Sequence, residues 1–299
     1  IQEEAPSLGK PVLFVLLFLA GFGILAYPTI SNQWNNYRQS RLISNYKNIT
    51  ENIDTEDFER EWEKAENYNA SITVNQPMSG DVFSEGGQED RDSEYWNVLN
   101  IAGDGMMGYI SIPKINVELA IYHGTSDEVL QTGVGHIEGT KLPIGGESNH
   151  TVLAAHRGLP SARLFTDLDQ LEEGDEFYIH ILDETLAYQV DQILPMVDKD
   201  DTGGLSEALA IEDGQDYVTL FTCTPYGVNT HRLLVRGTRV EYNGEEETPE
   251  TPADTVSNLL QDYYMFFLIG GVAVTAVAIG VIRMVMKRKR NRENAGPKQ

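Results

Sequence analysis

The sequence has one cysteine, Cys223, among its 299 residues. Proteins that are stabilised by disulfides carry cysteines in even sets, so a disulfide framework is excluded. A zinc site built on several cysteine ligands is excluded for the same reason. A lone thiol is either a small buried hydrophobic residue or a reactive group. The absence of any second cysteine favours the reactive group.

Basic residues are also scarce, with 22 Lys and Arg against 46 Asp and Glu. Residues 31–264 hold 14 of these basic residues and 43 of the acidic ones. Because phosphate binding needs the opposite sign of charge, a nucleic-acid partner is excluded. A solvated acidic surface is the simplest interpretation, and attraction to a Lys-rich protein substrate is the sharper one. The sequence has no phosphate-binding Gly-rich loop and no metal-ligand cluster with dedicated spacing, so we expect no cofactor.

Charge is nearly absent from two stretches, residues 11–30 and residues 263–286. Each has about the 20 residues that a helix needs to cross a bilayer. The alternatives are a cleaved signal peptide for the first and a buried core helix for the second. Residues 287–290 (KRKR) follow the second stretch, and such clusters stay on the cytoplasmic side. We therefore predict two transmembrane helices, both termini in the cytoplasm, and an extracytoplasmic region between the spans.

The other segments have distinct compositions. Residues 1–10 form an N-terminal tail, and because the first residue is Ile we expect further sequence upstream. Residues 31–75 carry apolar residues at helical spacing, which predicts one or two amphipathic extracytoplasmic helices. Residues 76–105 have the composition of a long loop. Residues 244–262 form an acidic linker, and residues 287–299 form the basic cytoplasmic tail.

Residues 106–243 have the pattern of a mainly β domain. Short apolar or alternating segments, separated by Gly, Pro, Asn and Asp, predict seven or eight strands in a barrel or sandwich. Residues 161–171 are the one expected short helix. The strand segments are residues 108–113, 117–122, 151–156, 177–181, 186–190, 217–223 and 232–240.

The last two of these strands form a predicted hairpin around the thiol. Residues 217–223 end at Cys223, residues 224–229 form the turn, and the returning strand carries Arg232 beside Cys223. A thiol attacks as the thiolate, so it needs a cation or a base nearby. An arginine at this place can hold the oxyanion of a tetrahedral intermediate. A surface salt bridge of little consequence is the alternative for Arg232.

Six histidines are candidates for the base. His156 ends the apolar segment 151–156, so its ring would face a cleft at a strand end. Spacing alone does not choose between it and the alternatives, which are His123, His136, His150, His180 and His231.

These residues resemble the sortase family. Residues 219–223 (TLFTC) resemble its TLxTC motif, and residues 231–237 (HRLLVRG) resemble the strand that carries its arginine. Residues 155–168 (AHRGLPSARLFTDL) resemble the segment around its catalytic histidine. The resemblance covers about residues 105–242. The two spans and the long N-terminal region resemble the class C branch, which assembles pili.

The resemblance implies an eight-stranded barrel and a catalytic triad. Cys223 would be the nucleophile, His156 the general acid and base, and Arg232 the stabiliser of the oxyanion or substrate. The implied substrate is a surface protein with an LPxTG-like sorting signal, cleaved after Thr through a thioacyl intermediate. In the pilus branch, a Lys side chain of the next pilin resolves that intermediate.

The resemblance also implies a lid before the barrel, with the pattern Asp-Pro-aromatic. Asp81-Val82-Phe83 is the best candidate, with Asp81 near the arginine and Phe83 over the cysteine. Val replaces Pro here, so the φ angle is not fixed and a looser or differently seated lid is expected. Glu94-Tyr95-Trp96 is a second candidate, and a disordered acidic loop is the alternative.

Three other functions compete with pilus assembly. A housekeeping-type sortase that anchors proteins to cell-wall peptide is opposed by the second span and the long N-terminal region. A non-catalytic, membrane-anchored binding protein is opposed by the intact Cys, His and Arg positions. A papain-like protease is disfavoured because its cysteine opens a helix near the start of the domain.

Overall fold

The computed structural model describes residues 9–75, 82–83 and 93–246, together with residues 270–271, 280, 283, 286–287 and 290. The chain divides into two compact units, one of residues 1–28 with 250–299 and one of residues 29–249. Helix α1 (Gly9–Glu51) begins in the first unit and ends in the second. All the strands belong to the second unit.

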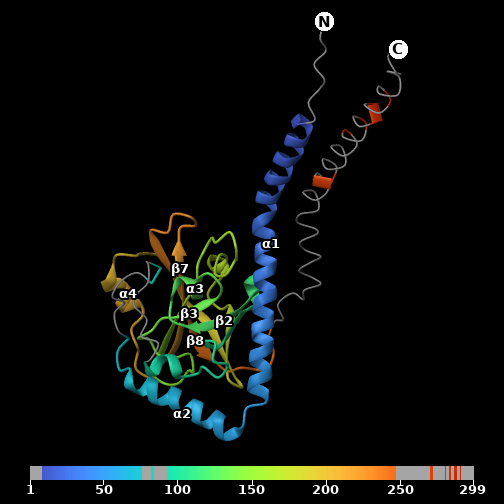
Figure 1. Ribbon diagram of the computed structural model, residues 1–299. Helices are drawn as coiled ribbons and strands as arrows, with labels where there is room; N and C mark the ends of the chain where they lie inside the picture. Colours follow the sequence, from blue (N-terminus) through green and yellow to red (C-terminus); the bar gives the residue numbers. More distant parts are fainter. Residues whose placement is uncertain are drawn as a thin grey trace, which may run out of the picture. The chain divides into compact units, whose positions relative to one another are not determined.

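Two helices precede the barrel, as the helical spacing predicted (Figure 1). In the second unit, α1 packs on the barrel through Ile43 and Tyr46, and the Tyr46 hydroxyl donates to the carbonyl oxygen of Met107 at 2.7 Å. Helix α2 (Thr55–Ser71) buries Ala65 and Asn69 against the barrel. These contacts make the helical region 31–75 part of the same folded unit as the strands.

The eight strands form a closed barrel in the order β1-β2-β3-β4-β7-β8-β6-β5. The predicted eight-stranded fold is therefore confirmed. Closure gives each strand of the barrel a hydrogen-bonded neighbour on both sides. The strands are β1 (Met106–Ile112), β2 (Val117–His123), β3 (Val134–His136), β4 (Asn149–Ala154), β5 (Glu176–Ile181), β6 (Glu184–Asp198), β7 (Asp216–Thr224) and β8 (His231–Val240).

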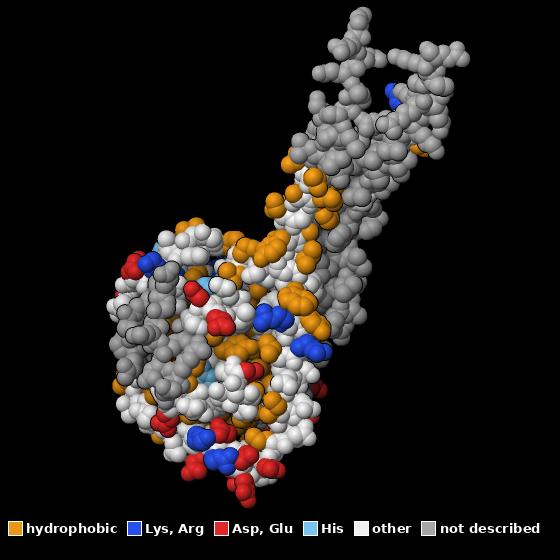
Figure 2. All heavy atoms as spheres, in the orientation of Figure 1, with side chains coloured by type: hydrophobic (Ala, Val, Ile, Leu, Met, Phe, Trp, Pro, Cys, Tyr) orange, Lys and Arg blue, Asp and Glu red, His pale blue; other side chains and the backbone are white. Residues whose placement is uncertain are grey.

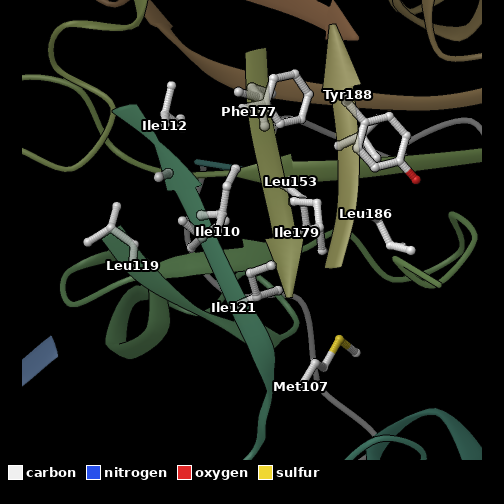
Figure 3. Close-up of a cluster of buried hydrophobic side chains, with 14 of the residues drawn as sticks. Met107, Ile110, Ile112, Leu119, Ile121, Leu153, Phe177, Ile179, Leu186 and Tyr188 are labelled. Carbon is white, nitrogen blue, oxygen red and sulfur yellow. The ribbon is translucent and has the colours of Figure 1, made fainter. Parts of the chain in front are cut away.

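The interior of the barrel is apolar and closely packed. Alternate residues of neighbouring strands point inward, as the two-residue period of a strand requires. Figure 3 shows Ile110 of β1, Leu119 of β2, Leu153 of β4, Ile179 of β5 and Leu186 of β6 gathered in one cluster. This core holds the strand ends in fixed positions and so supports the site described below.

Two local predictions differ from the structure. The prediction of a helix over residues 161–171 is wrong, because the structure has only the short 3₁₀ helix η3 (Leu168–Gln170) there. This segment instead folds back on the loop before it, and the amide of Phe165 donates to the carbonyl oxygen of His156 at 3.2 Å. Strand β3 was not predicted, since its three residues are too few to show an alternating pattern.

Of the other short elements in the described part of the chain, η1 (Glu94–Asn97) precedes β1, whereas η2 (Pro113–Ile115), α3 (Asp127–Leu130) and α4 (Thr202–Ala208) connect strands.

The two predicted membrane spans remain predictions. Across the described ranges, no helix combines the length and the apolar character that crossing a bilayer requires. Most of residues 263–286 lie outside the described residues. Figure 2 shows hydrophobic side chains along the described part of α1 and acidic side chains scattered over the strand-containing unit.

Candidate active site

Cys223 and Arg232 lie directly opposite each other in the β7–β8 hairpin. Directly opposed residues project from the same face of a sheet, with Cβ atoms about 5 Å apart. The predicted placement of Arg232 beside the thiol is therefore confirmed. Both residues are buried, Cys223 with 4% and Arg232 with 2% of its surface exposed.

The thiol projects from the outer face of the barrel. Leu220 of β7 belongs to the interior core, whereas its neighbour Phe221 belongs to a second hydrophobic cluster. Cys223, two residues after Phe221, shares that outer face because side chains alternate along a strand. The second cluster, which we call the outer cluster, comprises Leu130, Ile137, Val152, Ala154, Leu205, Leu209, Phe221 and Leu234, with Val82, Phe83, Leu194, Val197 and Ala208 packed against it.

The parallel pairing of β4 with β7 brings His156 to the thiol. Ala154, the last residue of β4, pairs with Phe221. The amide of Ala155 then donates to the carbonyl oxygen of Phe221 at 3.2 Å, and the Thr222 hydroxyl donates to the carbonyl oxygen of Ala155 at 2.7 Å. His156 therefore leaves β4 at the level of Cys223.

Phe83 lies between the groups that were predicted to be catalytic. Its ring centroid is 5.3 Å from that of His156 and 5.9 Å from that of Phe221, with the Phe221 ring nearly parallel. The Arg232 guanidinium carbon lies 5.2 Å from the Phe83 centroid, within the range of a cation–π contact. The predicted lid residue thus touches both His156 and Arg232.

The structure does not place the other predicted lid residues beside Cys223. Asp81 lies outside the described residues. Tyr95, the centre of the second lid candidate, is a core residue, since its hydroxyl donates to the carbonyl oxygen of His136 at 3.1 Å and accepts from the amide of Gly124 at 2.9 Å. The second candidate is therefore a structural element and not a lid.

His156 is partly buried, and this burial lowers the pKa of its imidazole below the usual 6.5. The negative charge of Asp127 opposes the shift and is the smaller effect. A pKa below 6.5 makes the neutral imidazole the main form at pH 7. A neutral imidazole can accept the proton of a thiol and return it later to a leaving amine.

Three of the other histidines are buried structural residues, unlike the partly exposed His156. His123, His136 and His150 are completely buried, and both ring nitrogens of each have hydrogen-bond partners. Burial lowers the pKa of each of these three rings. These three rings therefore have structural roles in the interior of the protein, where they hydrogen-bond to neighbouring chain segments.

The last two histidines also have structural partners. His180 stacks on Tyr109 at 4.0 Å and lies 3.5 Å from a Glu246 carboxylate oxygen. His231 is adjacent to Arg232 on β8, so its side chain projects from the opposite face of the strand. Among the six histidines, His156 is the one with a ring contact to Phe83.

The backbone beside Arg232 holds its guanidinium in place. Nη1 donates to the carbonyl oxygens of Asn229 at 3.0 Å and His231 at 2.7 Å. A guanidinium stays charged at any ordinary pH, so Arg232 places a permanent positive charge beside the thiol. That charge is suited to stabilise a thiolate or an oxyanion.

Metal ligands are not assembled within the described ranges, where no three His, Cys, Asp or Glu side chains form a group that would hold an ion. In the acidic stretch 198–201, at the end of β6, two carboxylates bind nearby backbone amides. The Asp201 carboxylate caps α4 by accepting from the amide of Gly204 at 3.0 Å, and Asp198 accepts from the amide of Asp200 at 3.0 Å.

Sequence reasoning did not identify Arg157. It follows His156 directly, its side chain is only 9% exposed, and it donates to Thr224 on β7 at 3.2 Å. The available signal was an arginine inside the segment that surrounds the histidine. Its partners lie up to 67 residues away, so spacing does not predict them.

The comparison with known proteins agrees with this geometry. The family model described as Sortase domain matches residues 110–240. Sortase D of Bacillus subtilis (strain 168) is 32% identical over 136 residues, which cover 44% of this chain and 63% of that protein. Sortase SrtE2 of Streptomyces coelicolor is 29% identical over 153 residues, which cover 48% of this chain and 60% of that protein. The chain thus spans less than two thirds of the length of these curated relatives.

Solved structures match over a larger share of the chain. Sortase C1 from Streptococcus agalactiae is 50% identical with a TM-score of 0.59, and the match covers 68% of this chain and all of that one. Sortase C-1 from Streptococcus pneumoniae is 43% identical with a TM-score of 0.60, and the match covers 68% of this chain and 99% of that one. From the barrel, the opposed Cys223 and Arg232, and these matches, we conclude that the chain belongs to the sortase family of cysteine transpeptidases.

Proposed function

We propose that this protein is a sortase that transfers a pilin or other surface protein from an LPxTG-like sorting signal to a Lys amine of the next pilin. The observation that carries the proposal is the opposition of Cys223 and Arg232 on β7 and β8, with His156 delivered to the same level by β4. The high identity to sortase C structures, one of them described as a pilus-related sortase, supports the pilus branch.

The reaction has two acyl-transfer steps. His156 takes the proton of the Cys223 thiol, and the sulfur attacks the carbonyl carbon of the Thr in the sorting signal. Arg232 stabilises the oxyanion of the tetrahedral intermediate. The C–N bond after Thr then breaks, His156 returns the proton to the leaving amine, and the thioacyl enzyme remains. In the second step, a Lys amine attacks this thioester, the C–S bond breaks as the isopeptide bond forms, and His156 passes the proton of the amine to the Cys223 sulfur.

Phe83 keeps the site closed at rest in this proposal. Its ring fills the space between His156, Phe221 and Arg232, and Val82 packs on the same outer cluster. A sorting signal that enters along the outer cluster would displace both side chains. Asp81 is the proposed partner that fixes this lid.

The membrane placement is also a proposal. Residues 11–30 and 263–286 would anchor the chain, with both termini in the cytoplasm and the barrel outside the cell. This would hold the acyl enzyme near substrates that are still anchored in the membrane. Protease protection in inside-out and right-side-out vesicles tests it, because the barrel should be digested only in right-side-out vesicles.

The test of function is mass spectrometry of the purified chain in detergent, incubated with an LPxTG peptide and then a peptide with a pilin-type Lys. We expect an adduct on Cys223, then an isopeptide product. An adduct that passes to a cell-wall peptide but not to Lys would favour the housekeeping-type alternative. An unreactive thiol in both wild type and Phe83→Ala would favour the non-catalytic binding protein.

A further inference from the structure

The loop that carries His156 is tied to β7 on both sides of Cys223. Before the histidine, the backbone of Ala155 is hydrogen-bonded to Phe221 and Thr222. After the histidine, Nη1 of Arg157 donates to the hydroxyl of Thr224 at 3.2 Å. The three residues 155–157 therefore bind the residues that flank Cys223, and His156 is the central one.

The guanidinium of Arg157 has three partners. Besides Thr224, its Nε donates to the carbonyl oxygen of Thr166 at 3.2 Å, and its Nη2 forms an ion pair with Asp169 at 2.5 Å. The loop is reinforced by the amide of Gly158, which donates to the Thr166 hydroxyl at 3.1 Å. Because its side chain is only 9% exposed and held on three sides, Arg157 is not placed to bind substrate.

We infer that Arg157 is a positioning residue that sets the place of His156 relative to Cys223. With its partners Thr166, Asp169 and Thr224 it forms what we call the Arg157 clamp. The inference rests on the proposed roles of Cys223 and His156. The clamp acts by geometry, since proton transfer between a thiol and an imidazole depends steeply on their separation. Arg232 has the different task of stabilising charge.

Arg157 fits this task better than lysine would. A guanidinium offers five N–H donors in a rigid fork, whereas an ammonium is a flexible point charge. Simultaneous bonds to a backbone carbonyl, a hydroxyl and a carboxylate need that fork. Lysine at residue 157 would keep the charge beside Asp169 but lose the link to Thr224.

The test is the pH dependence of Cys223 alkylation by iodoacetamide, which needs no peptide substrate. All variants are made in the Phe83→Ala background, so that the lid does not limit access to the thiol. We expect Arg157→Gln and Arg157→Lys to move the pH profile to that of His156→Ala. Thr224→Val should have the same effect, whereas Thr224→Ser keeps the hydroxyl and should behave like the parent. Adding Arg157→Gln to His156→Ala should change nothing further.

Arg163→Gln is the matched control. Arg163 lies in the same loop and pairs with Asp167 at 2.5 Å, but its side chain is 67% exposed. It should leave the alkylation profile unchanged. A parent-like profile for Arg157→Gln would overturn the clamp, and so would a further change when it is added to His156→Ala. A parent profile that already equals that of His156→Ala would also overturn it.

Single-turnover acylation by the sorting peptide separates the two proposals. Because Arg157→Gln breaks the clamp and displaces His156, we expect it to slow acylation about 10- to 100-fold with little change in peptide affinity, as for a catalytic group displaced by about 1 Å. Absence of any adduct in the parent would contradict the proposed function, while the alkylation profiles would still decide the clamp.

Discussion

Cys223 and Arg232 are directly opposed partners on adjacent strands, and both are almost completely buried. A permanent charge so close to a thiol has a strong effect because little water screens it. The hairpin therefore builds the electrostatic part of the site from local structure alone. The imidazole, in contrast, comes from a strand that is distant in sequence.

Arg232 should mainly stabilise the oxyanion of the transition state, so its loss should lower the rate of thioacyl formation. Removal of one oxyanion-stabilising group typically lowers kcat about 10²- to 10³-fold. We expect Arg232→Gln to show a loss of that size in thioacyl formation, and Arg232→Lys to recover only part of it. Arg236→Gln, on the same face of β8 but paired with Asp191 at 2.8 Å, is the control. An equal loss in both variants would mean that Arg232 has no special role.

Loss of the Phe83 ring should open the site. We expect Phe83→Ala to speed alkylation of Cys223 and hydrolysis of short sorting peptides, whereas Phe83→Leu keeps apolar bulk and should change both less. Because burial is what lowers the pKa of His156, the same substitution should raise that pKa toward 6.5. Titration of the His156 ring signals by NMR measures it. Unchanged alkylation together with an unchanged pKa would exclude Phe83 as a lid.

Much of this arrangement follows from local sequence. Residues 217–235 have a clear strand-turn-strand pattern, so the register of Cys223 and Arg232 was predictable. Strand β3 was not, because pairing with β2 and β4 defines it more than its own three residues do. The placement of His156 depends on the parallel pairing of β4 and β7, and the bonds of Arg157 depend on a loop that only the tertiary fold brings together.

Gly158 should be intolerant of a side chain. Its φ of +82° disfavours other residues, and an added Cβ would lie 3.0 Å from the ring of Tyr226. We expect Gly158→Ala to cost about 1–2 kcal/mol of folding free energy for the φ angle alone and to slow acylation further by shifting the His156 loop. Gly214→Ala, at φ +74° with open space around the Cβ, should cost similar stability and leave acylation unchanged. Thermal unfolding and acylation kinetics on both variants separate strain from loop displacement.

The folded state should lose stability in mild acid. Burial lowers the pKa of His136 from 6.5 to about 4. The unfolded chain therefore binds more protons than the folded chain between these values, and stability falls as the pH drops through this window. A shift of this size corresponds to roughly 3 kcal/mol, lost over about pH 6.5 to 4.

Urea unfolding at several pH values measures this loss. His136→Gln should be less stable at pH 7.5 but should show a shallower decline toward pH 4. An equally steep decline in that variant would assign the acid sensitivity to the other buried histidines or to the carboxylates.

The most direct test of the central claim is intact-mass spectrometry of the chain after incubation with an LPxTG peptide, with Cys223→Ala and His156→Ala as comparisons. We predict a thioacyl adduct on Cys223, ending at the Thr of the signal, that disappears when a Lys peptide is added and an isopeptide product forms. Cys223→Ala should form no adduct, and His156→Ala should form it far more slowly. An adduct that forms equally well in Cys223→Ala, or no adduct even with Phe83→Ala, would contradict the assignment of Cys223 as the nucleophile.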